Sequence, residues 1–241
     1  MPELDDLPQP IREPLRRFAD RIRELAKDNA LAWTLFGAVV AEKVAEKYAR
    51  PRHAIQSVLM LESVDLDLLH ALAAEGPRHG RAGLAPPVIM TPRFVEASRS
   101  TFPLELIEIH QHHRVVFGND HFAELKFDDR NIRLQCEREL DVLLIGLRQG
   151  LLIARGKKSR LALLQRNWVH NLMRTMRGLL WLKGQKEGLP ASRVLAEVAQ
   201  LAKLPLKGIH HVLHAGDSPG WEAFKHLYAD VEALESAADG W

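Results

Sequence analysis

Apolar and polar residues change their spacing near the middle of the chain. From Ile11 to Asp28, apolar residues recur at intervals of three and four, which predicts a helix with one buried face. Short apolar runs predict buried strands at residues 31–37, 54–61, 87–91, 104–110 and 115–117. Helical spacing separates these strands at residues 38–48, 66–74 and 93–100. This alternation indicates helices packed on a largely buried, mixed sheet.

Beyond about residue 130 the pattern is helical throughout. The predicted helices cover residues 132–154, 161–182, 191–202 and 221–236, with glycine or proline between them. Four helices joined by short links predict a helical bundle. The sequence therefore predicts an α+β fold in two domains: a small mixed β-sheet with helices over residues 1–130, and a C-terminal helical bundle over residues 131–241.

Composition excludes several classes of protein. The 241 residues are 46% hydrophobic and 27% charged, as in an average globular protein, which excludes collagen-like and wholly disordered chains. No apolar run approaches the roughly 20 residues that cross a bilayer, and the acidic N-terminus does not resemble a signal peptide. We therefore expect a cytoplasmic protein with no membrane partner. The single cysteine, Cys136, excludes a disulfide within the chain.

The positive charge is concentrated in one segment. Residues 1–128 carry a net charge of −3 and residues 129–241 a net charge of +5. Between Arg155 and Arg193 there are ten basic residues and one acid, Glu187. Such a segment either binds a nucleotide or nucleic acid or forms a solvated helix face, and the second reading is favoured. Trp168 and Trp181 lie in the same segment and either stack on bases or pack in the bundle core.

The middle of the chain resembles a known superfamily. The resemblance rests on residues 86–93, 102–109, 113–120 and 134–140. These segments are similar to bacterial proteins of the nucleotidyltransferase superfamily, which have the DNA-polymerase-β-like fold. The resemblance covers roughly residues 10–155. It implies a small mixed sheet with helices on one side, often followed by a helical bundle.

The resemblance also implies a chemistry. Active members place Gly-Ser at the start of the first helix, an Asp-x-Asp pair on the next strand and a third carboxylate on a later strand. These groups hold two divalent metals about 3.5–4 Å apart on the triphosphate and the attacking oxygen. The resemblance therefore implies a phosphate-binding loop at Gly37, and Mg²⁺ and a nucleoside triphosphate as the cofactors of an active enzyme.

This sequence departs from the superfamily pattern where the chemistry requires it most. Ala38 follows Gly37 in place of the serine, and Gln56 and Val58 occupy the Asp-x-Asp positions. Neither residue supplies a charged metal ligand. The chain therefore resembles a divergent or degenerate member of the superfamily.

Four other carboxylates are candidate catalytic residues: Asp65, Asp67, Glu105 and Glu108. Asp65-Leu-Asp67 looks locally like the motif, but the neighbouring leucines have helical spacing, which favours helix capping and surface charge for both aspartates. Glu105 and Glu108 lie in the predicted strand 104–110. An offset of three on a strand places them on opposite faces, so at most one faces a cleft. The metal ligands are left open.

Histidines form two further clusters, at His110, His112, His113 and His121 and at His210 and His214. In the first cluster they either bind zinc or a nucleotide phosphate or hydrogen-bond to the backbone, and backbone bonding is favoured. His210 and His214 are one helical turn apart, which is the spacing of a two-histidine metal site, but no glutamate completes the pattern.

Two functional hypotheses follow. The first is a nucleotidyltransferase-like protein that lacks the two-metal site and binds a nucleotide, a nucleic acid or a protein partner. The alternative is an active enzyme that moves a nucleoside monophosphate from a nucleoside triphosphate to an unknown acceptor. The enzyme requires at least two of the four carboxylates within about 5 Å of each other and facing Gly37. Asp65 and Asp67 on a helix that faces solvent would exclude it.

Overall fold

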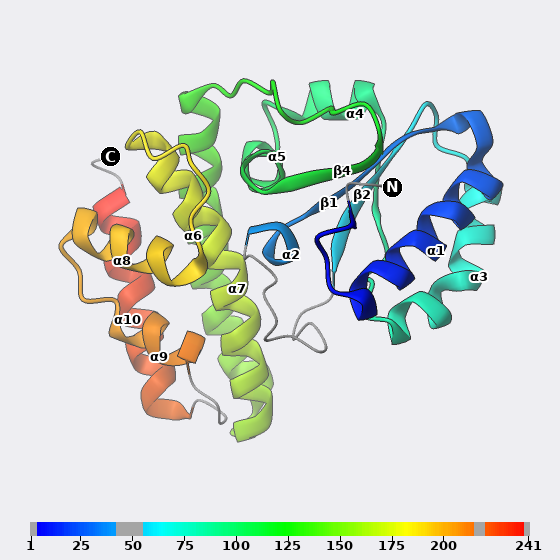
Figure 1. Ribbon diagram of the computed structural model, residues 1–241. Coiled ribbons are helices and arrows are strands. Elements are labelled where there is room, and N and C mark those ends of the chain that lie inside the picture. The colour runs from blue at the N-terminus through cyan, green and yellow to red at the C-terminus, as the bar shows by residue number, and fades with distance from the viewer. Residues whose placement is uncertain (1–3, 42–54, 215–219, 239–241) are drawn as a thin grey trace. The chain divides into compact units, whose positions relative to one another are not determined.

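The computed structural model describes residues 4–41, 55–214 and 220–238 (Figure 1). Its contacts divide the chain into two compact units. The N-terminal unit comprises Met1–Arg99 and Leu106–Lys126, and the C-terminal unit comprises Ser100–Glu105 and Phe127–Trp241. The main change of unit therefore lies between Lys126 and Phe127, four residues before the predicted limit at 130. Residues 100–105 also belong to the C-terminal unit.

The N-terminal unit is built on a mixed sheet of four strands, within the described residues, in the order β3-β2-β1-β4. The strands are β1 (Ala30–Phe36), β2 (Gln56–Leu61), β3 (Val88–Met90) and β4 (His113–Gly118). β1 is antiparallel to both β2 and β4, and β2 is parallel to β3. Each of these strands lies where an apolar run predicted one.

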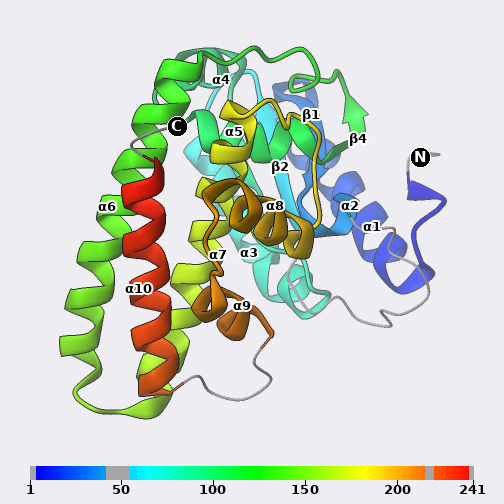
Figure 2. The same ribbon diagram turned by 90° about the vertical axis from the view of Figure 1, so that its left-hand side faces the viewer.

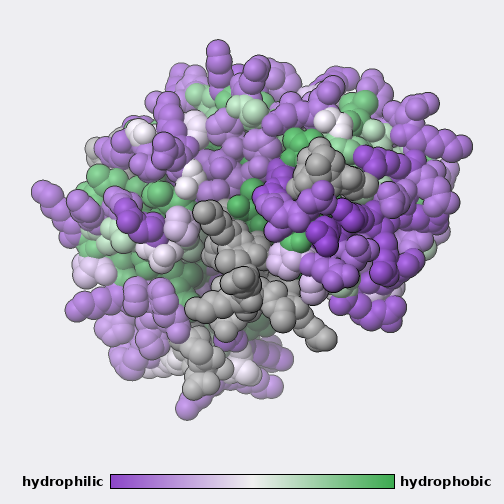
Figure 3. Space-filling view, viewed as in Figure 1, coloured by the Kyte–Doolittle hydropathy of each residue, from purple (hydrophilic) through white to green (hydrophobic). Residues whose placement is uncertain are grey.

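One face of the sheet is covered by α1 (Gln9–Ala26) and α3 (Leu66–Arg81), which lie side by side (Figure 1). Phe18 of α1 packs edge to face on Trp33 of β1, with ring centroids 5.3 Å apart. The same core includes Leu35 and Leu59. The outer surfaces of α1 and α3, at the right of Figure 3, are mainly hydrophilic. These helices are therefore amphipathic, as the spacing of three and four predicts.

The opposite face of the sheet is buried as well. Because side chains alternate along a strand, Thr34 and Phe36 of β1 and Val58 and Met60 of β2 point away from α1 and α3, and each is at most 8% exposed. A sheet buried on both faces gives continuous apolar runs rather than alternation. This explains why the strands are readable in the sequence as short apolar runs.

The predicted strand 104–110 is wrong. These residues form a helix, α5 (Pro103–Gln111), which crosses from the C-terminal unit to the N-terminal unit after Glu105. Leu104, Leu106, Ile107 and Ile109 are all at most 2% exposed, so the helix is apolar on more than one side and its sequence lacks a helical period. The helix-start signal is Pro103, because proline fits the first turn.

The remaining helices of the N-terminal unit follow the predictions where the structure describes them. α4 (Pro92–Ser98) begins at its proline, and the Thr91 hydroxyl accepts a hydrogen bond from Phe94 N. α2 (Ala38–Ala41) begins the predicted helix 38–48, and the rest of that segment lies outside the described residues. A short 3-10 helix, η2 (Lys27–Asn29), joins α1 to β1.

The C-terminal unit is helical, as predicted (Figure 2). Its helices are α6 (Asp129–Ala154), α7 (Lys158–Leu182), α8 (Ala191–Ala202), α9 (Lys207–His214) and α10 (Trp221–Ala238). The carboxylate of Asp230 on α10 accepts hydrogen bonds from Gly208 N and Ile209 N, which fixes the first turn of α9. The structure thus confirms an α+β fold, a small mixed sheet with helices followed by a helical bundle.

Both tryptophans of the basic segment pack within the bundle. Trp181 is 6% exposed, and its ring meets Phe127 edge to face at 5.5 Å. Trp168 fills the space above Gly146, where an added Cβ would lie 2.2 Å from its ring.

Cys136 is also buried, and burial raises the pKa of its thiol to about 12. Among the described residues, no helix has the length and apolar character that crossing a membrane requires.

We predict that Gly118→Ala destabilises the N-terminal unit by about 2 kcal/mol or more. Gly118 has a φ of +83°, and an added Cβ would lie 2.0 Å from the carbonyl oxygen of Leu31. The measurement is the free energy of unfolding in urea. Gly76→Ala is the matched control, because Gly76 is within α3 and has open space around it, so this change should leave the stability equal or slightly higher. Equal stability of the two variants would contradict the packing described at Gly118.

Candidate functional site

The turn that leaves β1 is held closed by backbone hydrogen bonds. Gly37 has a φ of +75°, a conformation that residues with a side chain rarely adopt. Its N–H donates to the carbonyl of His112 at 3.1 Å, and its carbonyl accepts from Val40 N at 2.9 Å. The predicted phosphate-binding glycine is therefore at the start of a helix as expected, but its own N–H is already used within the protein.

Gln56 lies directly over this turn. It pairs with Phe36 at the end of β1, and its Oε1 is 3.0 Å from the position that a Cβ on Gly37 would take. Val58, on the same face of β2, is 1% exposed. The two positions that carry Asp-x-Asp in the superfamily pattern thus present an amide and an alkyl group to the turn.

These residues do not fit the two-metal centre that the fold implies. Two divalent ions in close contact require several carboxylate oxygens, and neither Gln56 nor Val58 supplies one. Across residues 4–41, 55–214 and 220–238, no three side chains of the His, Cys, Asp and Glu types are grouped closely enough to hold a metal ion.

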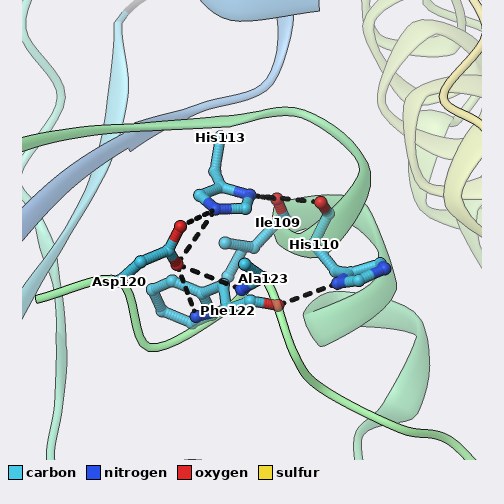
Figure 4. A network of polar contacts seen from close by, with 6 residues as sticks. All are labelled: Ile109, His110, His113, Asp120, Phe122 and Ala123. Atoms are coloured by element: carbon cyan, nitrogen blue, oxygen red, sulfur yellow. Dashed lines mark hydrogen bonds and ion pairs between the residues drawn. The ribbon is translucent and has the colours of Figure 1, made fainter. Parts of the chain in front are cut away.

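A histidine next to the Gly37 turn, His113, contacts both α5 and the loop after β4 (Figure 4). His113 follows His112 and pairs with Phe36. Its Nδ1 lies 3.0 Å and 3.1 Å from the carbonyl oxygens of Ile109 and His110, and its Nε2 lies 3.0 Å from the carboxylate of Asp120. We call Gly37, Gln56, His112, His113 and Asp120 the Gly37 corner.

Both ring nitrogens of His113 face oxygen acceptors. A backbone carbonyl only accepts hydrogen bonds, so Nδ1 is the donor to the carbonyl oxygens of Ile109 and His110, while Nε2 lies beside the Asp120 carboxylate. The ring therefore joins the end of α5 to the loop after β4.

The carboxylate of Asp120 holds His113 and the loop after β4 together through hydrogen bonds. Burial raises the pKa of Asp120, but the hydrogen bonds from His113, Phe122 N and Ala123 N outweigh burial and hold the pKa below its ordinary value. The carboxylate therefore stays charged across the physiological range and ties the start of β4 to the loop that follows it. The hydrogen bond from Phe122 N to Asp120 forms an Asx turn, in which an aspartate accepts from the backbone two residues further on.

Asp65 and Asp67 lie at the other end of β2 from the Gly37 corner. Gln56 begins the strand and Leu61 ends it, so five steps of about 3.4 Å, roughly 17 Å, separate the two ends. Asp65 caps α3, and its Oδ1 accepts from Asp67 N and Leu68 N. Both aspartates are exposed. The capping interpretation is confirmed for Asp65.

The carboxylate of Glu105 accepts hydrogen bonds within the C-terminal unit. Its two oxygens accept from Gln135 Nε2 at 2.8 Å and from Arg174 Nη1 at 3.1 Å. Gln135 in turn accepts from Leu104 N at 2.9 Å, so the first turn of α5 is fixed to α6. This carboxylate is therefore paired with an arginine and an amide of the same unit. Glu108 also lies on α5 rather than on a strand, so the expectation that Glu105 and Glu108 occupy opposite faces of a strand is wrong.

The basic segment is divided between internal contacts and solvent. Arg177 donates to the carbonyl of Leu189, Arg193 pairs with Glu197, and Lys186 lies over the ring of Trp181. Together with Arg174, these cations stabilise the bundle. The exposed cations are concentrated around the turn between α6 and α7: Arg155, Lys157, Lys158, Arg160 and Arg166.

The histidine clusters make local contacts. His110 Nδ1 lies 2.8 Å from the carbonyl of Phe122, which agrees with the favoured backbone bonding. On α9, His214 Nδ1 lies 2.9 Å from the carbonyl of His210, and the two rings stack.

Comparison with solved structures shows which known fold the chain resembles. No protein-family model matches the chain, and no curated protein matches it in sequence. Among solved structures, the chain is similar to spectinomycin adenyltransferase from Enterococcus faecialis, solved with ATP and spectinomycin, with a TM-score of 0.57 and 11% identity. The match covers 94% of this chain and 98% of that one. The chain has a nucleotidyltransferase-like fold. That likeness includes the helical second half, because it spans nearly the whole of both chains.

We predict that Asp120→Asn lowers the stability of the N-terminal unit by about 1 kcal/mol near neutral pH, a value reduced by partial exposure of the carboxylate. A carboxylate whose folded-state pKa is depressed stabilises the protein above its unfolded pKa, and this contribution is lost as the pH falls through the folded pKa. The difference from wild type should therefore shrink in acid. Urea unfolding at several pH values measures it, with Asp28→Asn as the control. A difference that is the same at every pH would contradict the assignment.

Proposed function

We propose that this protein is a binding protein on a nucleotidyltransferase-like fold and that it does not transfer nucleotidyl groups. The observation that carries the proposal is Gln56, which lies against the Gly37 turn where the superfamily pattern requires a carboxylate. A neutral amide accepts hydrogen bonds but does not balance the charge of two divalent cations. Val58, the second position, offers no ligand atom at all.

The other carboxylates do not replace the missing pair. Asp65 and Asp67 follow the far end of β2, and Asp65 is bound to backbone N–H groups. Glu105 is paired with Arg174. Glu108 alone would leave a single carboxylate, and its two oxygens are too few ligands to hold two divalent ions. These positions favour binding over the alternative, metal-dependent nucleotidyl transfer.

A nucleotide is the first ligand to test. The protein that shares this fold was solved with ATP, which supports a nucleotide as the ligand class. Gln56 and the polar groups of the Gly37 corner offer hydrogen bonds that need no metal. A nucleic acid or a protein partner, bound through the exposed cations around the α6–α7 turn, is the remaining class of ligand.

Calorimetric titration with ATP and with GTP, each with Mg²⁺ and with EDTA, tests the binding. We predict binding that does not depend on Mg²⁺. Pyrophosphate release, measured with and without spectinomycin as the acceptor, tests transfer, and we predict none above the background without protein. Mg²⁺-dependent binding together with pyrophosphate release would contradict the proposal.

If pyrophosphate release is observed, two variants identify the residues that it requires. Asp65→Asn and Asp67→Asn remove charge while an asparagine at position 65 keeps the helix cap. We predict that neither changes nucleotide affinity. A loss of pyrophosphate release in either variant, or in Glu108→Gln, would identify an active site and overturn the binding role.

A further inference from the structure

The sequence around the turn between α6 and α7 contains basic residues and no acidic ones. No aspartate or glutamate occurs between Asp141 and Glu187 in the sequence. Around the turn, Arg155, Lys157, Lys158 and Arg160 are all exposed, and Arg155 and Gly156 have a positive φ that makes the turn tight. The end of this helical hairpin is therefore strongly basic.

Large apolar side chains are exposed at the same end. Leu152 and Ile153, in the last turn of α6, are 77% and 66% exposed, and Leu163 on α7 is 56% exposed. Trp221, the first residue of α10, is 51% exposed. Gln165 of α7 donates to the carbonyl of Gly220, and Figures 1 and 2 both show α10 beginning at the end of the bundle where α6 and α7 meet. We call these four apolar and four basic residues the bundle-end patch.

The packing of α6 on α7 explains this exposure. An added Cβ on Gly150 would lie 2.1 Å from Leu164, so the two helices approach closely on their inner faces. Leu152, Ile153 and Leu163 consequently lie outside that contact. Glu222, an acid in the first turn of α10, is paired with Lys225 at 2.8 Å.

We propose that the bundle-end patch docks on an anionic lipid surface. Lysine and arginine attract acidic headgroups, while leucine, isoleucine and tryptophan enter the boundary between headgroups and acyl chains. The long basic side chains extend toward the headgroups while their stems stay apolar. This contact lies on the surface of a bilayer, so it requires no spanning helix and revises the expectation that the chain has no membrane partner.

A lipid surface fits this patch better than a nucleic acid does. Both attract the four cations, but a nucleic acid binds exposed rings by base stacking and has no use for exposed Leu152, Ile153 and Leu163. A bilayer uses both kinds of side chain. The proposal rests on the C-terminal unit alone and is independent of the function proposed above.

Vesicle flotation with the full chain tests the proposal. The vesicles are phosphatidylcholine alone and phosphatidylcholine with about one third phosphatidylserine. We predict binding to the second kind only, and weaker binding at high salt. Lys157→Glu with Lys158→Glu should weaken it by about tenfold or more, and Leu152→Ser with Ile153→Ser by a similar factor.

Matched controls lie near the other end of α6. Arg130→Glu with Arg138→Glu reverses two exposed charges near the start of α6, and Leu134→Ser with Val142→Ser removes two exposed apolar side chains there. Both should bind vesicles as the wild type does, with circular dichroism confirming the fold of each variant. No binding to acidic vesicles, equal losses in the controls, or binding to a labelled single-stranded oligonucleotide without vesicle binding would overturn the proposal.

Discussion

β1 is paired with an antiparallel strand on each side, and the chain leaves its end through a turn that requires a left-handed backbone conformation. Gly37 meets this constraint with a positive φ, and its N–H closes on the carbonyl of His112 at the start of β4. Gln56 at the start of β2 fills the space above the turn. Three segments distant in sequence thus meet at one glycine. At this end of β1, Phe36 pairs with Gln56 of β2 on one side and with His113 of β4 on the other.

The superfamily pattern that the sequence resembles would put carboxylates at positions 56 and 58, and other groups lie there. Gln56 presents an amide, Val58 an alkyl group, and the ring of His113 contacts the Asp120 carboxylate within the protein. The fold depends on the glycine turn and on the strand register, and neither requires metal ligands. Likeness of fold therefore does not by itself establish the usual activity.

The sequence predicted the helices and strands whose apolar residues follow a clear helical or strand period. It missed the helix in which apolar residues on several sides hide that period. β1, β2, α6, α7, α8 and α10 follow from apolar runs and from spacings of three and four, whereas α9 is not among the four predicted helices. α5 was predicted as a strand because four buried aliphatic residues surround Glu105 and Glu108, which hides the helical period. Asp65 was predicted as a cap because the neighbouring leucines fixed the helix. The pair of His113 with Asp120 and the pair of Glu105 with Arg174 join residues that only the folded chain brings together, and local spacing carries little information about such contacts.

The central claim is that the Gly37 corner does not assemble a divalent-metal centre. Titration of the protein with Mn²⁺, followed by the electron paramagnetic resonance signal of the free ion, tests this claim without any substrate. The account predicts that the free-ion signal rises as it does in buffer through the micromolar range. One or two Mn²⁺ ions bound tightly per chain, and released when Glu108 is changed to glutamine, would contradict it.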